Sequence, residues 1–198
     1  MMGNALDNQE EANELISFWQ SRLQMINNTL ANVTPDQRKH VYYMLGGYTH
    51  TNGGNLWGQA LITAAGGINV AQDFGPGEDT SVEQVLKWNP DVIIISENEG
   101  NYTTIDQVKN NSQLSSLNAV KNNQLYECPI GAFWWDRPSP EGILGIEWLA
   151  KTLYPDQFAN LNMTNETRNF YQTFYHYNLT DTQINAILNP QSPGNRVY

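Results

Sequence analysis

The sequence predicts an α/β fold: a Rossmann-like, parallel or mostly parallel sheet of four to five strands with helices on both faces, preceded by one long helix. Three observations lead to this prediction. Residues 7–31 carry a helical apolar stripe, short β-branched or aromatic runs then alternate with helical stretches, and the segment 91–96 contains a continuous apolar run. Such alternation is typical of parallel sheets, whose central strands are buried on both faces.

The long helix is expected over residues 7–31. Its apolar positions recur every three or four residues, as on one face of a helix: Ala12, Leu15, Trp19, Leu23, Ile26 and Leu30. Asp7 and Glu10 resemble a capping box at the start, and Thr34 with Pro35 closes the segment. At roughly 35 Å, such a helix spans one lobe and reaches another.

The remaining elements follow in order. Strands are expected at 40–47, 68–71, 91–96 and 124–128, and helices at 55–67, at 81–90 with Ser81 as N-cap, near 103–110, and from Pro140 to about Tyr154. Two short helices are expected within 164–188. The aromatic stripe of this tail (Phe170, Tyr171, Phe174 and Tyr175) is interpreted as core.

Composition excludes several classes of partner. The net charge is −10, with ten Lys and Arg and no basic cluster, which argues against nucleic acid and anionic lipid. Cys128 is the single cysteine, so it forms no internal disulfide and is expected to be a small buried residue. No Cys/His spacing fits zinc, and no apolar run approaches the ~20 residues that span a bilayer.

Ligands of open α/β sheets bind beyond the carboxyl ends of the strands. The loops expected there are 48–55, 72–79, 97–102 and 129–138, all on one edge. Each combines Gly or Pro with aromatic, acidic, amide or His side chains, a composition that suits an organic ligand. The sequence contains no G-x-S-x-G, Walker, dinucleotide-binding or H-E-x-x-H motif. His50 and the carboxylates Asp73, Glu97 and Asp136 have no evident catalytic pairing, so we do not expect an enzyme.

Three stretches resemble a known family. These are "SVEQVLKWNPDVIIIS", "LSSLNAVKNNQLYECPIGAFWWDRPSPEGILGIEWLAKTLYPDQF" and "FYQTFYHYNLTDTQINAIL". Together they resemble the C-terminal part of the substrate-binding proteins of ABC importers for siderophores, haem and cobalamin. The resemblance implies two Rossmann-like lobes joined by a rigid helix. Residues 1–34 would be the interlobe helix and 35–198 the C-terminal lobe, with an N-terminal lobe of the same protein missing.

The resemblance also implies a site. The loop after the fourth strand would face the ligand, with Trp135 preferred over Trp134 for the cleft and the other tryptophan in the core. Arg137 would pair with an anionic chelate or, alternatively, with Asp136 or another local acid. Further candidate contacts lie on the same edge: Tyr48, His50, Glu97 and Asp136. Glu141 would dock on arginines of the permease, although ordinary helix capping also accounts for it.

The expected function is capture of an iron chelate, such as a siderophore, haem or a cobalamin-like molecule, and its delivery to an ABC permease by a monomer with no cofactor or metal site of its own. The alternatives are a cell-surface binding or adhesion module and, less favoured, a small hydrolase-type enzyme using His50 and Asp136. The expected location is extracytoplasmic, with a membrane anchor in the full-length protein. Seven N-x-[S/T] acceptors support this, where chance supplies about three: Asn27, Asn32, Asn101, Asn110, Asn162, Asn165 and Asn178.

Overall fold

One sheet organises the chain. The computed structural model describes residues 8–75, 77–98 and 100–190. Within them, strands follow the order β4-β2-β1-β5-β6, with β3 beside the first half of β1. Their bounds are β1 (His40–Leu45), β2 (His50–Thr51), β3 (Ile68–Asn69), β4 (Glu78–Asp79), β5 (Val92–Ser96) and β6 (Leu125–Glu127). Pairs β1–β3, β1–β5 and β5–β6 are parallel, whereas β2 and β4 add antiparallel pairs.

The mostly parallel sheet predicted from the sequence is confirmed, but two predicted loops contain strands. β2 lies within 48–55 and β4 within 72–79, and they pair through His50 with Asp79 and Thr51 with Glu78. Two-residue strands are too short to show an alternating pattern, so no local signal separates them from loop.

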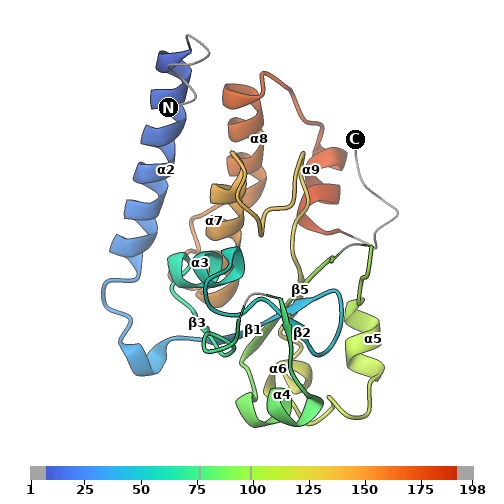
Figure 1. Cartoon of the computed structure of the whole chain (residues 1–198). Helices are drawn as coiled ribbons and strands as arrows, with labels where there is room; N and C mark the ends of the chain where they lie inside the picture. The colour runs from blue at the N-terminus through green and yellow to red at the C-terminus, as the bar shows by residue number, and fades with distance from the viewer. Residues whose placement is uncertain (1–7, 76, 99, 191–198) are drawn as a thin grey trace.

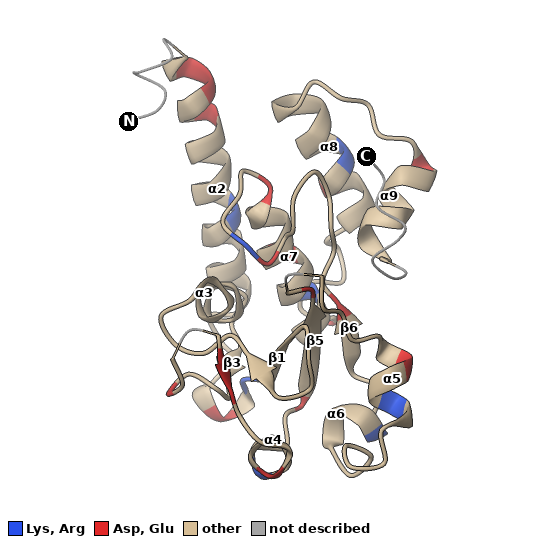
Figure 2. Cartoon of the chain, turned by 45° about the vertical axis from the view of Figure 1, so that its right-hand side comes forward, with Lys and Arg blue, Asp and Glu red and all other residues tan. Residues whose placement is uncertain are grey.

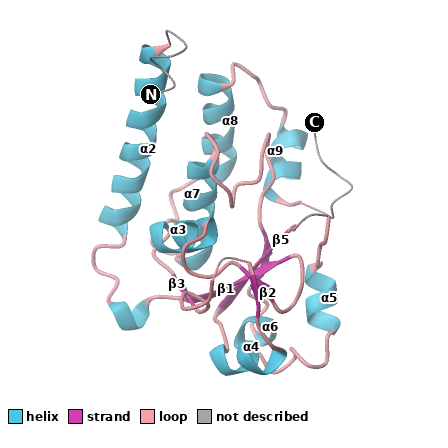
Figure 3. Ribbon diagram, in the orientation of Figure 1, coloured by secondary structure: helices cyan, strands magenta, loops and turns pink. Residues whose placement is uncertain are grey.

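Successive strand residues face opposite layers. Tyr43 and Leu45 of β1 join the core under one set of helices, while Tyr42 and Met44 join the core on the other side. The first layer holds α2 (Gln9–Thr29), α3 (Trp57–Ala64), α7 (Gly142–Leu153), α8 (Met163–Phe174) and α9 (Asp181–Leu188). The second holds α4 (Val82–Trp88), α5 (Ile105–Asn110) and α6 (Asn118–Lys121) (Figures 1 and 3). Every residue of β5 is buried, as its apolar composition predicts.

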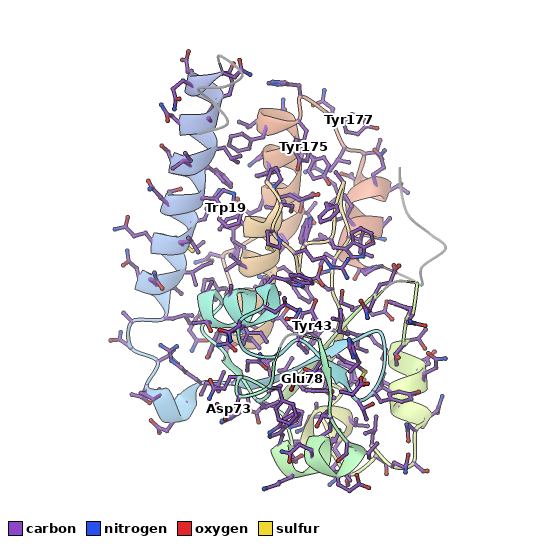
Figure 4. The ribbon with its side chains drawn as sticks, in the orientation of Figure 1. Trp19, Tyr43, Asp73, Glu78, Tyr175 and Tyr177 are labelled. Carbon is purple, nitrogen blue, oxygen red and sulfur yellow. The ribbon has the colours of Figure 1, made fainter. Side chains whose placement is uncertain are left out.

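The long helix α2 packs along the first layer. It ends at Thr29, and the short 3-10 helix η1 (Pro35–Gln37) follows. The indole Nε1 of Trp19 donates to the carbonyl of Pro140 at 3.0 Å, and Figure 4 shows Trp19 pointing from α2 toward α7. The predicted cap at Asp7 lies outside the described residues. A 21-residue helix is about 32 Å long.

Helix α7 lies at the centre of the first layer, and all its residues from Gly142 to Ala150 are buried. It begins at Gly142, two residues later than the predicted start at Pro140, with Glu141 at the cap position and no side-chain capping bond. The aromatic tail packs as predicted: ring centroids of Phe18 and Phe170 lie 5.7 Å apart, and those of Phe170 and Phe174 lie 4.9 Å apart. The structural interpretation of this stripe is therefore confirmed.

Candidate ligand-binding site at the carboxyl edge of the sheet

Because β1, β5 and β6 are parallel, the segments that follow them meet at one edge of the sheet. Two hydrogen bonds tie the first two segments together: Gly46 N–H donates to Ser96 O at 2.8 Å, and Thr103 Oγ1 donates to Gly46 O at 2.9 Å. Gly46 has a φ of +79°, and a Cβ there would lie 3.0 Å from Cβ of Asn98. This edge is therefore tightly packed, and glycine at 46 permits that packing.

The cation of the site is Arg137. Its guanidinium carbon lies 4.6 Å from the ring centroid of Trp134 and 5.9 Å from that of Trp57, the first residue of α3. Nη2 donates to the backbone carbonyl of Glu97, and the side chain keeps 18% of its surface exposed. Arg137 thus joins the segments after β5 and β6 to the start of α3, with aromatic rings against a partly exposed charge.

Below Arg137 lies a buried acid. Asp136 is 2% exposed, and its Oδ2 accepts hydrogen bonds from the Tyr43 hydroxyl and from Ser96 Oγ at 2.6 Å. Nε of Arg137 lies 3.8 Å from the same oxygen, so the predicted local pairing of Arg137 with Asp136 is present. Burial, and then the charge of Asp136, raise the pKa of Tyr43, which therefore stays a donor at physiological pH. Figure 4 shows Tyr43 in the sheet beneath the helices of the first layer.

The loop between β6 and α7 folds around the carboxylate of Glu141. Its Oε1 accepts from the backbone N–H of Phe133 at 2.5 Å, and Oε2 accepts from Trp135 Nε1 at 3.1 Å and from the Tyr171 hydroxyl at 2.6 Å. The Tyr171 oxygen in turn accepts from the backbone N–H of Ala132 at 2.6 Å. We call this arrangement the Glu141 cradle.

A glycine makes the cradle possible. A Cβ on Gly131 would lie 2.3 Å from Glu141 Oε2, 2.3 Å from the Tyr171 hydroxyl and 2.9 Å from Trp135 Nε1. Burial raises the pKa of Glu141, and the hydrogen bonds from Tyr171, Phe133 and Trp135 oppose that rise. The cradle therefore attaches the loop both to the start of α7 and to α8.

This geometry corrects two predictions. Trp135, preferred for the cleft, is 1% exposed and anchors the loop in the core, whereas Trp134 lies beside Arg137 and is partly exposed. One tryptophan is thus in the core, as expected, and Trp134 rather than Trp135 has exposed surface at the edge. Glu141 is fully buried, so its carboxylate is not available for the predicted surface contact with a permease.

The other predicted contacts separate into two groups. Glu97, which is 8% exposed, and Asp136 adjoin Arg137. Tyr48 and His50 have their partners elsewhere. Tyr48 packs with the second-layer core and its hydroxyl donates to Gln107 O at 3.4 Å, and Nδ1 of His50 lies 2.7 Å from Asp79 Oδ1 on the antiparallel β2–β4 ribbon.

Sequence reasoning missed Trp57, Tyr43 and Tyr171 as parts of this region. Trp57 carried a usable signal, because it follows the Gly53-Gly54 loop at a helix start on the carboxyl edge. Tyr43 and Tyr171 carried none, since each belongs to an apolar pattern.

The described residues hold no ready metal site. Figure 2 shows acidic residues spread over many elements of the ribbon and few basic ones. Within residues 8–75, 77–98 and 100–190, no three His, Cys, Asp or Glu side chains gather as metal ligands.

Cys128 is buried, as predicted, and burial raises the pKa of its thiol. Among the described residues, no helix has the length and hydropathy needed to cross a bilayer.

Comparison with known proteins identifies the class. Residues 1–130 match the family described as periplasmic binding protein, and the chain belongs to that family. It is therefore related to solute-binding proteins rather than to enzymes, as predicted. Relatives named as periplasmic or lipoprotein components support an extracytoplasmic location for the family.

Two curated relatives show how much of this chain, and of each relative, is matched. The molybdate-binding protein MolA of Haemophilus influenzae is 28% identical over 177 residues, covering 88% of this chain and 50% of MolA. The Fe(3+)-citrate-binding protein YfmC of Bacillus subtilis is 25% identical over 130 residues, covering 64% of this chain and 39% of YfmC. The chain thus spans about half the length of the curated relatives it matches, or less.

Solved structures agree with this placement. A periplasmic solute-binding protein from Veillonella parvula superposes with a TM-score of 0.83 at 33% identity, covering 94% of this chain and 57% of that one. MolA bound to molybdate gives a TM-score of 0.77 at 27% identity, covering 90% and 54%. The predicted resemblance to ABC substrate-binding proteins, and the α/β fold it implies, are confirmed.

Proposed function

We propose that this chain forms the C-terminal lobe of the substrate-binding component of an ABC importer, and that its carboxyl edge forms one wall of the cargo cleft. The cargo is a small anionic metal species, with an iron chelate as the first candidate. An N-terminal lobe of the same protein supplies the second wall, and α2 links the two lobes. The full-length protein acts as a monomer outside the cytoplasm, anchored to the membrane.

The observation that carries this proposal is the position of Arg137. Its guanidinium has five N–H donors, one of which reaches the carbonyl of Glu97, and it is partly exposed between indole rings at the edge where such sheets bind ligands. Planar guanidinium groups bind carboxylate and other oxygen anions in bidentate geometry. The Trp134 ring adds a flat surface for an organic chelate at a small cost in side-chain entropy.

Molybdate is the second candidate, because the relative MolA is named for binding it. Molybdate and ferric citrate share oxygen-anion chemistry, which Arg137 suits in either case. Haem and cobalamin-like molecules would depend more on Trp134. The described residues form no cluster of metal ligands. We therefore expect the metal to be coordinated by the cargo molecule and not by this lobe.

The test is a fluorescence titration of the full-length protein. The panel is ferric citrate, a ferric hydroxamate siderophore, haem, cobalamin and molybdate. We expect a saturable signal with one panel member and at least a tenfold loss of affinity in Arg137→Gln, because an anion loses its charged partner. Arg168→Gln is the matched control, since Arg168 pairs with the exposed Asp181. No binding to any member would overturn the proposal, and binding to molybdate alone would replace the iron chelate as cargo.

Transport separates the proposal from a cell-surface binding or adhesion module on the same fold. Uptake of the bound compound by cells should require both this protein and its permease. Binding without any dependence of uptake on the protein would favour the surface module. Turnover of a panel compound by the full-length protein would instead favour an enzyme.

A further inference from the structure

We propose that this protein carries N-linked sugars at Asn32, Asn110 and Asn178. The inference rests on an extracytoplasmic location and not on the identity of the cargo. The sequence has seven acceptor motifs, and in the structure all seven asparagines are exposed. Exposure alone does not choose among them, because most asparagines of the chain are exposed. The motifs are distinguished by the secondary structure, the hydrogen bonds and the exposure of their residues.

Two motifs lie wholly inside helices, from the asparagine to the hydroxyl residue. Asn27 belongs to α2 and Asn165 to α8, where each hydroxyl two residues later bonds back into its own helix. Thr29 Oγ1 donates to Met25 O and Thr167 Oγ1 to Met163 O, both at 2.8 Å. Helical backbone holds the amide and the hydroxyl in a fixed arrangement, so a transferase that needs an extended or turn segment finds these two closed.

Two further motifs are occupied by the fold. The amide oxygen of Asn162 caps α8 by accepting from Asn165 N–H at 3.2 Å. In the Asn101 motif, the hydroxyl residue Thr103 is 6% exposed and donates to Gly46 O. The backbone of Asn101 also bonds the backbone of Asn98 beside the carboxyl edge. A sugar on Asn101 would project beside the proposed cargo wall.

The remaining three share a different setting. Asn32 lies in the turn after α2, Asn110 is the last residue of α5, and Asn178 lies in the connection between α8 and α9. Within the described ranges none of these three amide side chains makes a hydrogen bond. Thr34 and Thr180 take part in capping boxes at the starts of η1 and α9, but the Ser or Thr residue of each of the three motifs is exposed. In the other four motifs this residue is buried or half-buried: Thr29, Thr103, Thr164 and Thr167. Asn32 precedes β1 and so lies toward the amino edge of the sheet, and Asn110 ends a helix of the second layer. Sugars on Asn32 and Asn110 would therefore project away from Arg137 and Trp134.

The chemistry requires one co-reactant, a sugar linked to a lipid phosphate. The Asn Nδ2 forms a bond to the anomeric carbon C1, the bond from C1 to the phosphate oxygen breaks, and the lipid phosphate leaves with the electron pair. The amide nitrogen releases one proton to the solvent, and no oxidant or reductant takes part. The Ser or Thr hydroxyl two residues later is the feature that the acceptor motif specifies.

The experiment is a glycopeptide map by mass spectrometry of the full-length protein purified from its natural cells, with intact mass as a second readout. We expect sugar on the peptides of Asn32, Asn110 and Asn178. Each change to Gln should remove the mass of one glycan, and removing all three should return the chain to its unmodified mass. Asn160→Gln is the matched control, because Asn160 is exposed but is followed by Leu161 and Asn162 and so forms no motif.

Each result of this experiment either supports the proposal or contradicts it. Complete coverage with all three asparagines unmodified overturns the proposal. Sugar confined to Asn27, Asn165, Asn162 or Asn101 overturns the selection argued from the fold. A bare peptide at one of the three sites removes that site. Cargo binding measured on the same preparation is independent of these results, so failure here and failure of the proposed function are distinguishable.

Discussion

Two buried glutamates at the start and middle of α7 contrast sharply. Glu141 and Glu147 are both 0% exposed, six residues apart in the chain. Glu141 accepts three hydrogen bonds, whereas neither carboxylate oxygen of Glu147 has a hydrogen-bond partner within the described residues. Glu147 depends on Arg22 of α2, whose Nε lies 3.5 Å away and whose Nη2 bonds Glu166 at 2.5 Å.

The two glutamates are equally buried, but their carboxylates have different surroundings and therefore different pKa shifts. Burial raises the pKa of Glu147 to about 8, Arg22 lowers it, and the nearby charge of Glu166 raises it. At Glu141 the raising effect of burial is opposed by three donors from the loop and α8. Hydrogen bonds make one buried acid a structural centre, while a shared arginine leaves the other a group that titrates near neutral pH.

A large loss of stability is expected from Glu141→Ala. It leaves the buried Trp135 Nε1 and Tyr171 hydroxyl and the part-buried Phe133 N–H without their acceptor, and each unsatisfied buried donor costs about 1–3 kcal/mol. We expect the free energy of unfolding to fall by about 3 kcal/mol or more in urea denaturation. Glu141→Gln keeps an acceptor oxygen and should lose less. Equal losses in both variants would contradict the cradle.

Gly131→Ala tests the same centre by adding atoms. The new methyl would lie 2.3 Å from both Glu141 Oε2 and the Tyr171 oxygen, and overpacking costs typically ~1–3 kcal/mol. The control is Gly47→Ala, because a Cβ there meets nothing within 4 Å. If both variants unfold at the same urea concentration, the loop does not close on Glu141 as described.

Glu147 should make stability depend on pH. Its folded-state pKa of about 8 lies above the unfolded value, so the folded chain binds the extra proton, and stability falls as pH rises from about 4.5 to about 8. Glu147→Gln should remove this fall, so its free energy of unfolding should exceed that of the natural chain above pH 8. Denaturation at pH 5 and 8.5 measures the difference. A constant gap between the two proteins across that range would argue against a raised pKa.

Trp134→Ala is expected to have the smallest effect on stability. Trp134 is partly exposed and stacks on Arg137, so its loss should change unfolding by about 1 kcal/mol, far less than Trp135→Ala, which empties a buried site at about 3–5 kcal/mol. In the full-length protein the order should reverse for cargo, with Trp134→Ala weakening binding. Intact affinity in Trp134→Ala would move the cargo wall elsewhere on the edge.

Much of the fold could be predicted because its patterns are local. The stripe of α2 and the apolar run of β5 each specify an element through their own spacing, and the alternation of elements predicts the parallel sheet. The strands β2 and β4 escaped prediction because two residues carry no period. The position of the segment containing Trp134, Asp136 and Arg137 at the carboxyl edge could also be predicted, because it follows a strand of a parallel sheet.

By itself, the sequence determined that adjacent Trp134 and Trp135 point to opposite sides, since neighbouring side chains of an extended segment must diverge. Only the tertiary structure decided which one faces inward. The carboxylate of Glu141 accepts hydrogen bonds from Tyr171 of α8 and from Trp135. Gly131 has no side chain and so leaves room for these groups. The physical reason is that a buried carboxylate needs donors from several elements, and that requirement is met by groups distant in sequence. No local pattern could show that Glu141, at a helix start, turns inward.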